Sequence, residues 1–96
     1  MKAFFIFYDQ ELLPEVEFLL RSSKVENFSR FTAVQGKGDS GLKEGSAVGP
    51  GLNHALWIVL EDQISQKFLS ELKEFKKDKL KQKGIKIFMF PIEASL

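Results

Sequence analysis

The side chains and backbone groups best suited to chemistry lie in one glycine-rich segment, residues 36–51, which holds six of the seven glycines. Glycine lets backbone N–H groups turn toward an anion, and Lys37 or Lys43 could supply a point charge for a phosphate. The segment lacks the glycine, lysine and hydroxyl spacing of a nucleotide-hydrolysing phosphate loop. A plain hairpin connection is the alternative, but unstructured connections of this length are usually functional. We therefore expect a ligand or partner clamp.

Two side chains outside this segment also need an explanation. Lys86 interrupts an apolar stretch directly after Gly84 and Ile85, so we expect it to face a pocket or a sheet edge. His54 is the only histidine and has no cysteine or second histidine near it, so we interpret it as structural and expect no metal site.

The clustered charges are interpreted as solvated surface. Glutamates at positions 11, 15 and 17 suit the polar face and N-terminal dipole of a helix better than a catalytic carboxylate pair. The lysines between residues 76 and 83 suit a solvated helix end, or an anion pocket if a neighbouring subunit meets them. No catalytic residue is expected.

Composition limits the class of protein. Ninety-six residues, 44% of them hydrophobic, allow one domain over residues 1–96 with a packed core. A net charge of +1 argues against nucleic acid or anionic lipid as a partner. There is no cysteine, signal peptide or membrane-length apolar segment, so we expect a cytoplasmic protein with no direct membrane insertion.

The apolar patterning predicts strand, helix, strand, strand, helix, strand. We expect Asp62 to cap the second helix and Gly84 to end it. Its apolar stripe is expected to be Ile64, Phe68, Leu72 and Phe75. The expected ranges are 3–8, 14–22, 28–35, 54–60, 62–84 and 85–90.

This order predicts an α+β, ferredoxin-like βαββαβ domain: a four-stranded antiparallel sheet with both helices on one face. The strands at 3–8 and 54–60 are apolar on both sides, which suits the two central positions. The strand at 28–35 has mixed faces and is expected at an edge. Helices cover only one face, so we expect a second copy of the chain to cover the other.

The chain resembles the P-II signalling family over nearly its whole length. The resemblance rests on residues 34–38 at the loop base, Glu61-Asp62 after the third strand, and the finish 84–93. Residues 40–53 are similar to the divergent P-II-like branch associated with heavy-metal efflux. The resemblance implies a bacterial homotrimer that senses a small-molecule effector between subunits and regulates a membrane transporter or other protein through its loop.

The resemblance also implies site residues, and an adenine nucleotide (ATP, ADP or AMP) as the effector. Asp39 and Ser40 replace an arginine and a glutamine of the main family, Lys43 and Ala47 replace histidines expected in the efflux-associated branch, and the basic C-terminal tail is missing, so other small anions stay open. The implied ligand-binding residues are Gly36, Lys37, Gly38, Asp39, Ser40, Gly41 and Lys86, and the implied partner-binding residues are Lys43, Glu44, Gly45 and Ser46.

Three other classes share this topology. Acylphosphatases need an arginine in the phosphate loop, and none follows Val34-Gln35-Gly36. CutA-like metal-tolerance proteins lack this glycine density in the loop. RNA-recognition domains carry a basic, glycine and aromatic run on the third strand, which is missing here.

Overall fold

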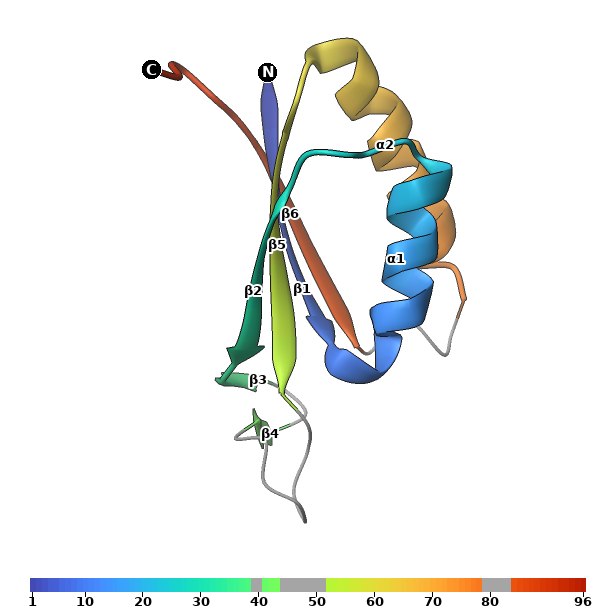
Figure 1. Cartoon of the computed structure of the whole chain (residues 1–96), viewed down its shortest axis with the longest axis vertical. Coiled ribbons are helices and arrows are strands. Elements are labelled where there is room, and N and C mark those ends of the chain that lie inside the picture. The colour runs from blue at the N-terminus through green and yellow to red at the C-terminus, as the bar shows by residue number, and fades with distance from the viewer. Residues whose placement is uncertain (39–40, 44–51, 79–83) are drawn as a thin grey trace.

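In the part of the chain that the structure describes, two helices pack on one face of a four-stranded antiparallel sheet and no helix lies on the other face (Figure 1). The computed structural model describes residues 1–38, 41–43, 52–78 and 84–96. The arrangement confirms the predicted α+β ferredoxin-like fold. The elements are β1 (Lys2–Asp9), the 3-10 turn η1 (Gln10–Leu12), α1 (Leu13–Ser22), β2 (Ser29–Val34), β3 (Gly36–Gly38), β4 (Gly41–Lys43), β5 (Asn53–Leu60), α2 (Asp62–Phe75) and β6 (Ile85–Pro91).

The strand order of the main sheet is β2-β5-β1-β6, so β1 and β5 are central as predicted, and β2 lies at an edge as predicted. The two central strands pair along their full lengths, from Lys2 opposite Leu60 to Asp9 opposite Asn53. Because both of their faces are apolar, the central position removes the most apolar surface from water.

The hydrophobic core lies between this sheet and the helices. Phe4 on β1 meets Phe68 on α2 edge to face, with 5.0 Å between the ring centroids. The fully buried side chains of this layer also include Ile6, Tyr8, Val16, Leu56, Ile58, Leu72 and Ile85.

Helix α1 begins one residue before the predicted start and ends at the predicted residue, Ser22. Pro14 lies in the first turn, where a backbone N–H has no acceptor within the helix, so the N–H that proline lacks is not needed. The carboxylate of Glu15 in the same turn interacts favourably with the positive end of the helix dipole. Val16 and Leu20 are buried against the sheet, whereas Phe18 points outward with 66% of its surface exposed.

Helix α2 differs from the prediction in three ways. Asp62 is the first helical residue and not a cap; its carboxylate pairs with the N-terminal ammonium group at 2.9 Å. Ser65 takes the buried place predicted for Ile64, because its hydroxyl donates to the Leu60 carbonyl at 3.1 Å while Ile64 is 48% exposed. The helix ends at Phe75 and not at Gly84.

The early end of α2 has a physical reason in the sequence that follows it. Phe75 is the last side chain of the helix that packs against the core. Residues 76–78, which come next, are two lysines and an aspartate and bring no apolar side chain to hold a further turn on the sheet. Neither described helix has the length and apolar character needed to cross a membrane.

Two features of β2 and of the segment after it differ from the predicted pattern. The register of β2 against β5 shifts between Phe31 and Val34, and Ala33 adopts a left-handed φ of 58°. This bulge breaks the simple alternation expected along the strand. In the predicted loop, β3 and β4 pair antiparallel, with Lys37 opposite Leu42. Strands this short and rich in glycine have no alternation of apolar and polar residues, so the sequence pattern does not predict them.

Candidate functional site

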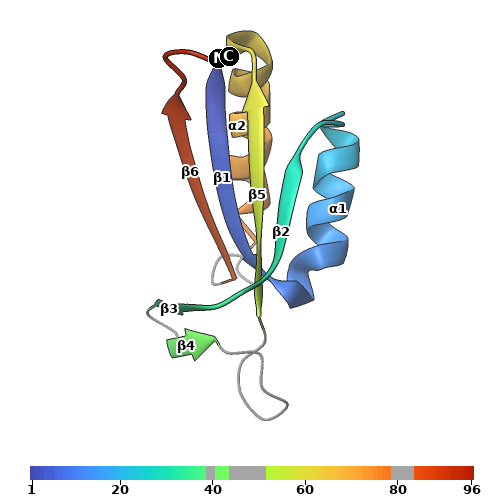
Figure 2. The same cartoon turned by 60° about the vertical axis from the view of Figure 1, so that its left-hand side comes forward.

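The long segment after β2 leaves and rejoins the sheet at one end, which we call the loop-bearing end (Figure 2). The loop-bearing end consists of the last residues of β1 and β2 and the first residues of β5 and β6. The register places Asn53 opposite Asp9 on one side and Val34 on the other. Ile85 lies opposite Tyr8. All four strands therefore contribute to this end.

The end of β1 and the turn η1 hold two parts of the loop-bearing end through backbone hydrogen bonds. The Gln10 N–H donates to the Leu52 carbonyl at 3.1 Å, and the Asp9 N–H donates to the Gly84 carbonyl at 2.7 Å. A Cβ on Gly84 would lie 2.8 Å from Leu12 Cδ1, so a larger residue there would require the Leu12 side chain to shift. The return of the long segment is thus held by η1, and the residue before β6 is held by Asp9 at the end of β1.

The described part of the predicted ligand site lies at this end. Gly36, Lys37 and Gly38 form β3, and Gly41 to Lys43 form β4. Lys86 lies exposed on β6, opposite Phe7, and of its two predicted locations, a pocket or a sheet edge, the strand order agrees with the edge. The other predicted residues, Asp39, Ser40, Glu44, Gly45 and Ser46, lie outside the described residues.

The two parts of this site are attached to different strands of the main sheet. β2, which leads into Gly36, and β6, which carries Lys86, lie at opposite edges of the sheet. Three strand spacings separate those edges, a distance of about 14 Å. The strand order therefore separates the starting points of the two parts, whereas β3 and β4 form a small sheet of their own.

A polar cluster that the sequence analysis did not identify lies beside α1. Arg30 on β2 forms an ion pair with Glu17 of α1 and donates from Nε to the Tyr8 hydroxyl at 3.2 Å. Its guanidinium carbon also lies 5.1 Å from the centre of the Phe28 ring. Arg30, the arginine near the loop base, therefore already has its guanidinium group bound within this cluster.

Burial raises the pKa of Tyr8 above its ordinary value, because the charged phenolate would lose water. Glu17 adds to the rise by repulsion, while the hydrogen bond and positive charge of Arg30 act against it. Tyr8 is the only tyrosine in the chain. Its hydroxyl therefore remains protonated across the neutral range and serves as an acceptor for Arg30.

His54 lies on the same side of the sheet, with its ring 5.4 Å from the ring of Tyr8. Its Nδ1 atom is buried and has no hydrogen-bond partner among the described residues. Nothing in the described part of the chain gathers three or more potential metal-ligating side chains.

The helix-free face of the sheet, which we call the open face, carries a connected group of aromatic rings. Phe5 stacks on Phe7 at 4.7 Å and meets Trp57 edge to face at 5.7 Å. Phe88 and Phe90 of β6 join Phe7 and Trp57 at 6.4 and 5.7 Å. The outer rings stay accessible, with 54% of Phe88 exposed. An apolar sheet face of this kind in water is a candidate protein contact.

The architecture has counterparts among solved structures, whereas neither a protein-family model nor a curated protein matches the chain. CPII from Thiomonas intermedia K12, a nitrogen regulatory PII-like protein bound to ADP, AMP and bicarbonate, superposes with a TM-score of 0.72. Its identity is 15%, over 98% of this chain and 93% of CPII. The chain has the PII-like fold.

Two further structures agree with this assignment. The apo form of CPII has a TM-score of 0.66 at 13% identity, over 95% of this chain and 87% of CPII. A PII-like signaling protein from Thermus thermophilus has a TM-score of 0.66 at 12% identity, over 93% of this chain and 83% of the other. At these identities the likeness establishes the PII-like fold, and the function has to be argued from the site.

Proposed function

We propose that this chain is a PII-like regulatory protein. It assembles as a homotrimer through the open face, binds a small anionic effector between subunits at the loop-bearing end, and acts in the cytoplasm on a partner such as a membrane transporter through residues 43–46. The observation that carries this proposal is that β2, which leads to Gly36, and β6, which carries Lys86, lie at opposite sheet edges, in a fold whose open face is aromatic and has no described helix on it. Both features call for further subunits.

The chemistry of the proposed site favours an anion. Lys37 and Lys86 supply positive charge, while Gly36 and Gly38 pair with β4. CPII, which shares the fold, is described as bound to ADP, AMP and bicarbonate. Adenine nucleotides and bicarbonate are therefore the first effectors to test.

The proposal is tested by calorimetric titration with ATP, ADP, AMP and bicarbonate, together with a mass measured by light scattering at micromolar concentration. We expect a trimer mass and a saturable signal with at least one of the anions. A monomer would overturn the intersubunit site, and a trimer that binds none of the four would overturn this effector class.

Variants locate the site. Lys86→Ala removes a charge-assisted hydrogen bond worth about 1.5–3 kcal/mol, so effector affinity should fall roughly tenfold to a hundredfold. Lys67→Ala removes an equal charge from an exposed position on α2 and is the matched control. Equal affinities for the two variants would place the effector elsewhere.

Acylphosphatase-like catalysis is not proposed, because it needs an arginine at the loop base. Arg30, on the strand that leads to that base, is held by Glu17 and Tyr8, and Arg21 lies on α1. Turnover of an acyl phosphate that survives Lys86→Ala and is lost with Arg30→Met would reverse this conclusion.

A further inference from the structure

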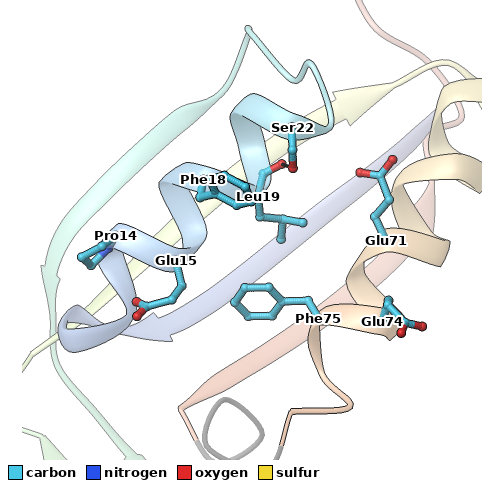
Figure 3. A pocket seen from close by; sticks show the side chains of 8 residues that line it. All are labelled: Pro14, Glu15, Phe18, Leu19, Ser22, Glu71, Glu74 and Phe75. Carbon is cyan, nitrogen blue, oxygen red and sulfur yellow. Dashed lines mark hydrogen bonds between the residues drawn. The ribbon is translucent and has the colours of Figure 1, made fainter.

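A groove of about 670 Å³ runs between α1 and α2 on the side of the helices that faces away from the sheet (Figure 3). Phe18 and Leu19 of α1 and Phe75 of α2 contribute apolar surface to it. Phe18 is the exception to the amphipathic pattern of α1, because two thirds of its surface stays in water although its neighbours are buried. A large aromatic side chain in that position contributes little to the subunit's own core.

Carboxylates surround this apolar floor. Glu15 lies on the α1 side, and Glu71 and Glu74 lie on the α2 side (Figure 3). No basic side chain is found among the described residues that line the groove, although the whole chain has a net charge of +1. The groove is therefore a local acidic surface on a nearly neutral protein.

The three carboxylates are only partly engaged. Glu71 accepts a hydrogen bond from the Ser23 hydroxyl, and Glu74 pairs with Lys77 at 3.1 Å where both side chains are well exposed. Glu15 forms no ion pair with any described residue. Exposed pairs of this kind are weak, so an incoming cation can replace Lys77 at little cost.

We propose that this helical groove binds a basic amphipathic helix of a partner protein. The partner's apolar side chains would pack on Phe18 and Phe75, and its lysines or arginines would pair with the surrounding glutamates. Recognition through an apolar row with flanking charges is a general mode by which a groove binds a helix. The acidic lining repels an anionic effector, so this surface is separate from the site at the loop-bearing end.

The groove stays accessible in the proposed assembly. It lies on the helical side of the sheet, and the open face lies on the other (Figure 1). Each subunit of a homo-oligomer would present one such groove. Several weak grooves on one particle can hold a multivalent partner much more tightly than a single groove can.

The experiment uses two labelled synthetic peptides of equal length, each with leucines at the helical spacing i, i+3, i+4 and i+7. One carries lysine at every polar position and the other glutamate. Binding is followed by fluorescence anisotropy at physiological salt. We expect the lysine peptide to bind saturably and the glutamate peptide to bind at least about tenfold more weakly.

Variants test the position of the bound peptide. Phe18→Ser should lower the affinity for the lysine peptide about tenfold. Ile64→Ser, at an exposed apolar position on α2, should leave that affinity within about twofold of the parent. The double variant Glu15→Lys, Glu74→Lys should lower the affinity for the lysine peptide and raise the affinity for the glutamate peptide. Glu26→Lys with Glu93→Lys changes the net charge equally outside the groove and should not reverse the preference.

Three outcomes would overturn the proposal. Equal binding of both peptides would mean nonspecific apolar adhesion. A Phe18→Ser variant that folds and binds like the parent would put the peptide on another surface. A particle mass that rises with concentration and falls back in Phe18→Ser would make the groove a contact between copies of this chain. Unchanged peptide binding in Lys86→Ala would keep this inference separate from the proposed effector site.

Discussion

The two faces of the sheet are made by the same four strands, yet they finish their packing in different ways. On the helical face, Phe4, Leu56 and Ile58 are fully buried by the subunit's own helices. On the open face, Phe5 meets Trp57 within the sheet, and Phe88 is half exposed. The helical face is therefore a complete core, whereas the open face keeps aromatic surface exposed to water. Subunit stability and assembly should therefore respond to different substitutions.

The largest effect is expected on the helical face. Phe68→Ala removes the ring that meets Phe4 and leaves a cavity, so the free energy of unfolding should fall by about 3–5 kcal/mol. Urea denaturation measures this loss. Phe18→Ala is the matched control on α1 and should change stability little, because that ring is exposed. A loss under about 1 kcal/mol for Phe68→Ala would contradict the complete core.

The next effect is expected on the open face. Phe88→Lys places a charge where the proposed contact is apolar, so the dissociation constant of the assembly should rise by a factor of about 30 or more, the range of an interface hot spot. Dilution series in analytical ultracentrifugation measure the change. Ile64→Lys is the control on the helical side. If Phe88→Lys unfolds the isolated subunit instead, the two faces are not independent.

A smaller effect on stability is expected for the cluster around Arg30. Arg30→Met keeps the aliphatic stem but removes the ion pair to Glu17 and the hydrogen bond to Tyr8, which should cost about 1–2 kcal/mol. Arg21→Met, at an exposed position, should stay within about 0.5 kcal/mol of the parent. A cycle with Glu17→Gln should be non-additive, since the two side chains share one interaction. Additive losses would show that the pair contributes little.

The smallest effect is a change with alkaline pH. The pKa of Tyr8 is raised in the folded protein, so the folded state holds this proton at pH values where the unfolded state has lost it. This contribution to stability is complete below the ordinary tyrosine pKa of 10.0 and is lost as pH rises through the folded value. Absorbance of the tyrosinate reports this one group, because Tyr8 is the only tyrosine.

Arg30→Met should move the Tyr8 transition to still higher pH, because the guanidinium is the group that lowers the pKa. A transition in the parent protein at or below the ordinary value would contradict the buried phenol. A transition unaffected by Arg30→Met would contradict the contact between the two side chains.

The fold could be predicted from the sequence because its signals are long and periodic. The doubly apolar strands around Phe5 and Trp57 identified the centre of the sheet, and the resulting topology identified the open face. The errors lie where one local contact decides the outcome. Ser65 is buried because its hydroxyl reaches the Leu60 carbonyl, and no hydrophobicity pattern contains that information.

The candidate site was less predictable. Gly36 and Lys86 are predicted to share one site, but the placement of β2, which leads to Gly36, and β6, which carries Lys86, at opposite edges follows only from the strand order. The cluster of Arg30, Glu17 and Tyr8 joins three elements that are distant in sequence. The groove depends on one exposed ring, Phe18, and on the spacing of two helices.

The edge strands have a consequence for solubility. A sheet edge offers unpaired backbone groups to any other strand, and an exposed aromatic face beside it would favour growth into aggregates. On one edge the bulge at Ala33 disrupts regular pairing, and on the other Lys86 places a charge on β6. Together these two devices allow assembly through the face while discouraging open-ended addition at the edges. Substitutions at either position should therefore be screened for fibre formation before any loss of binding is interpreted.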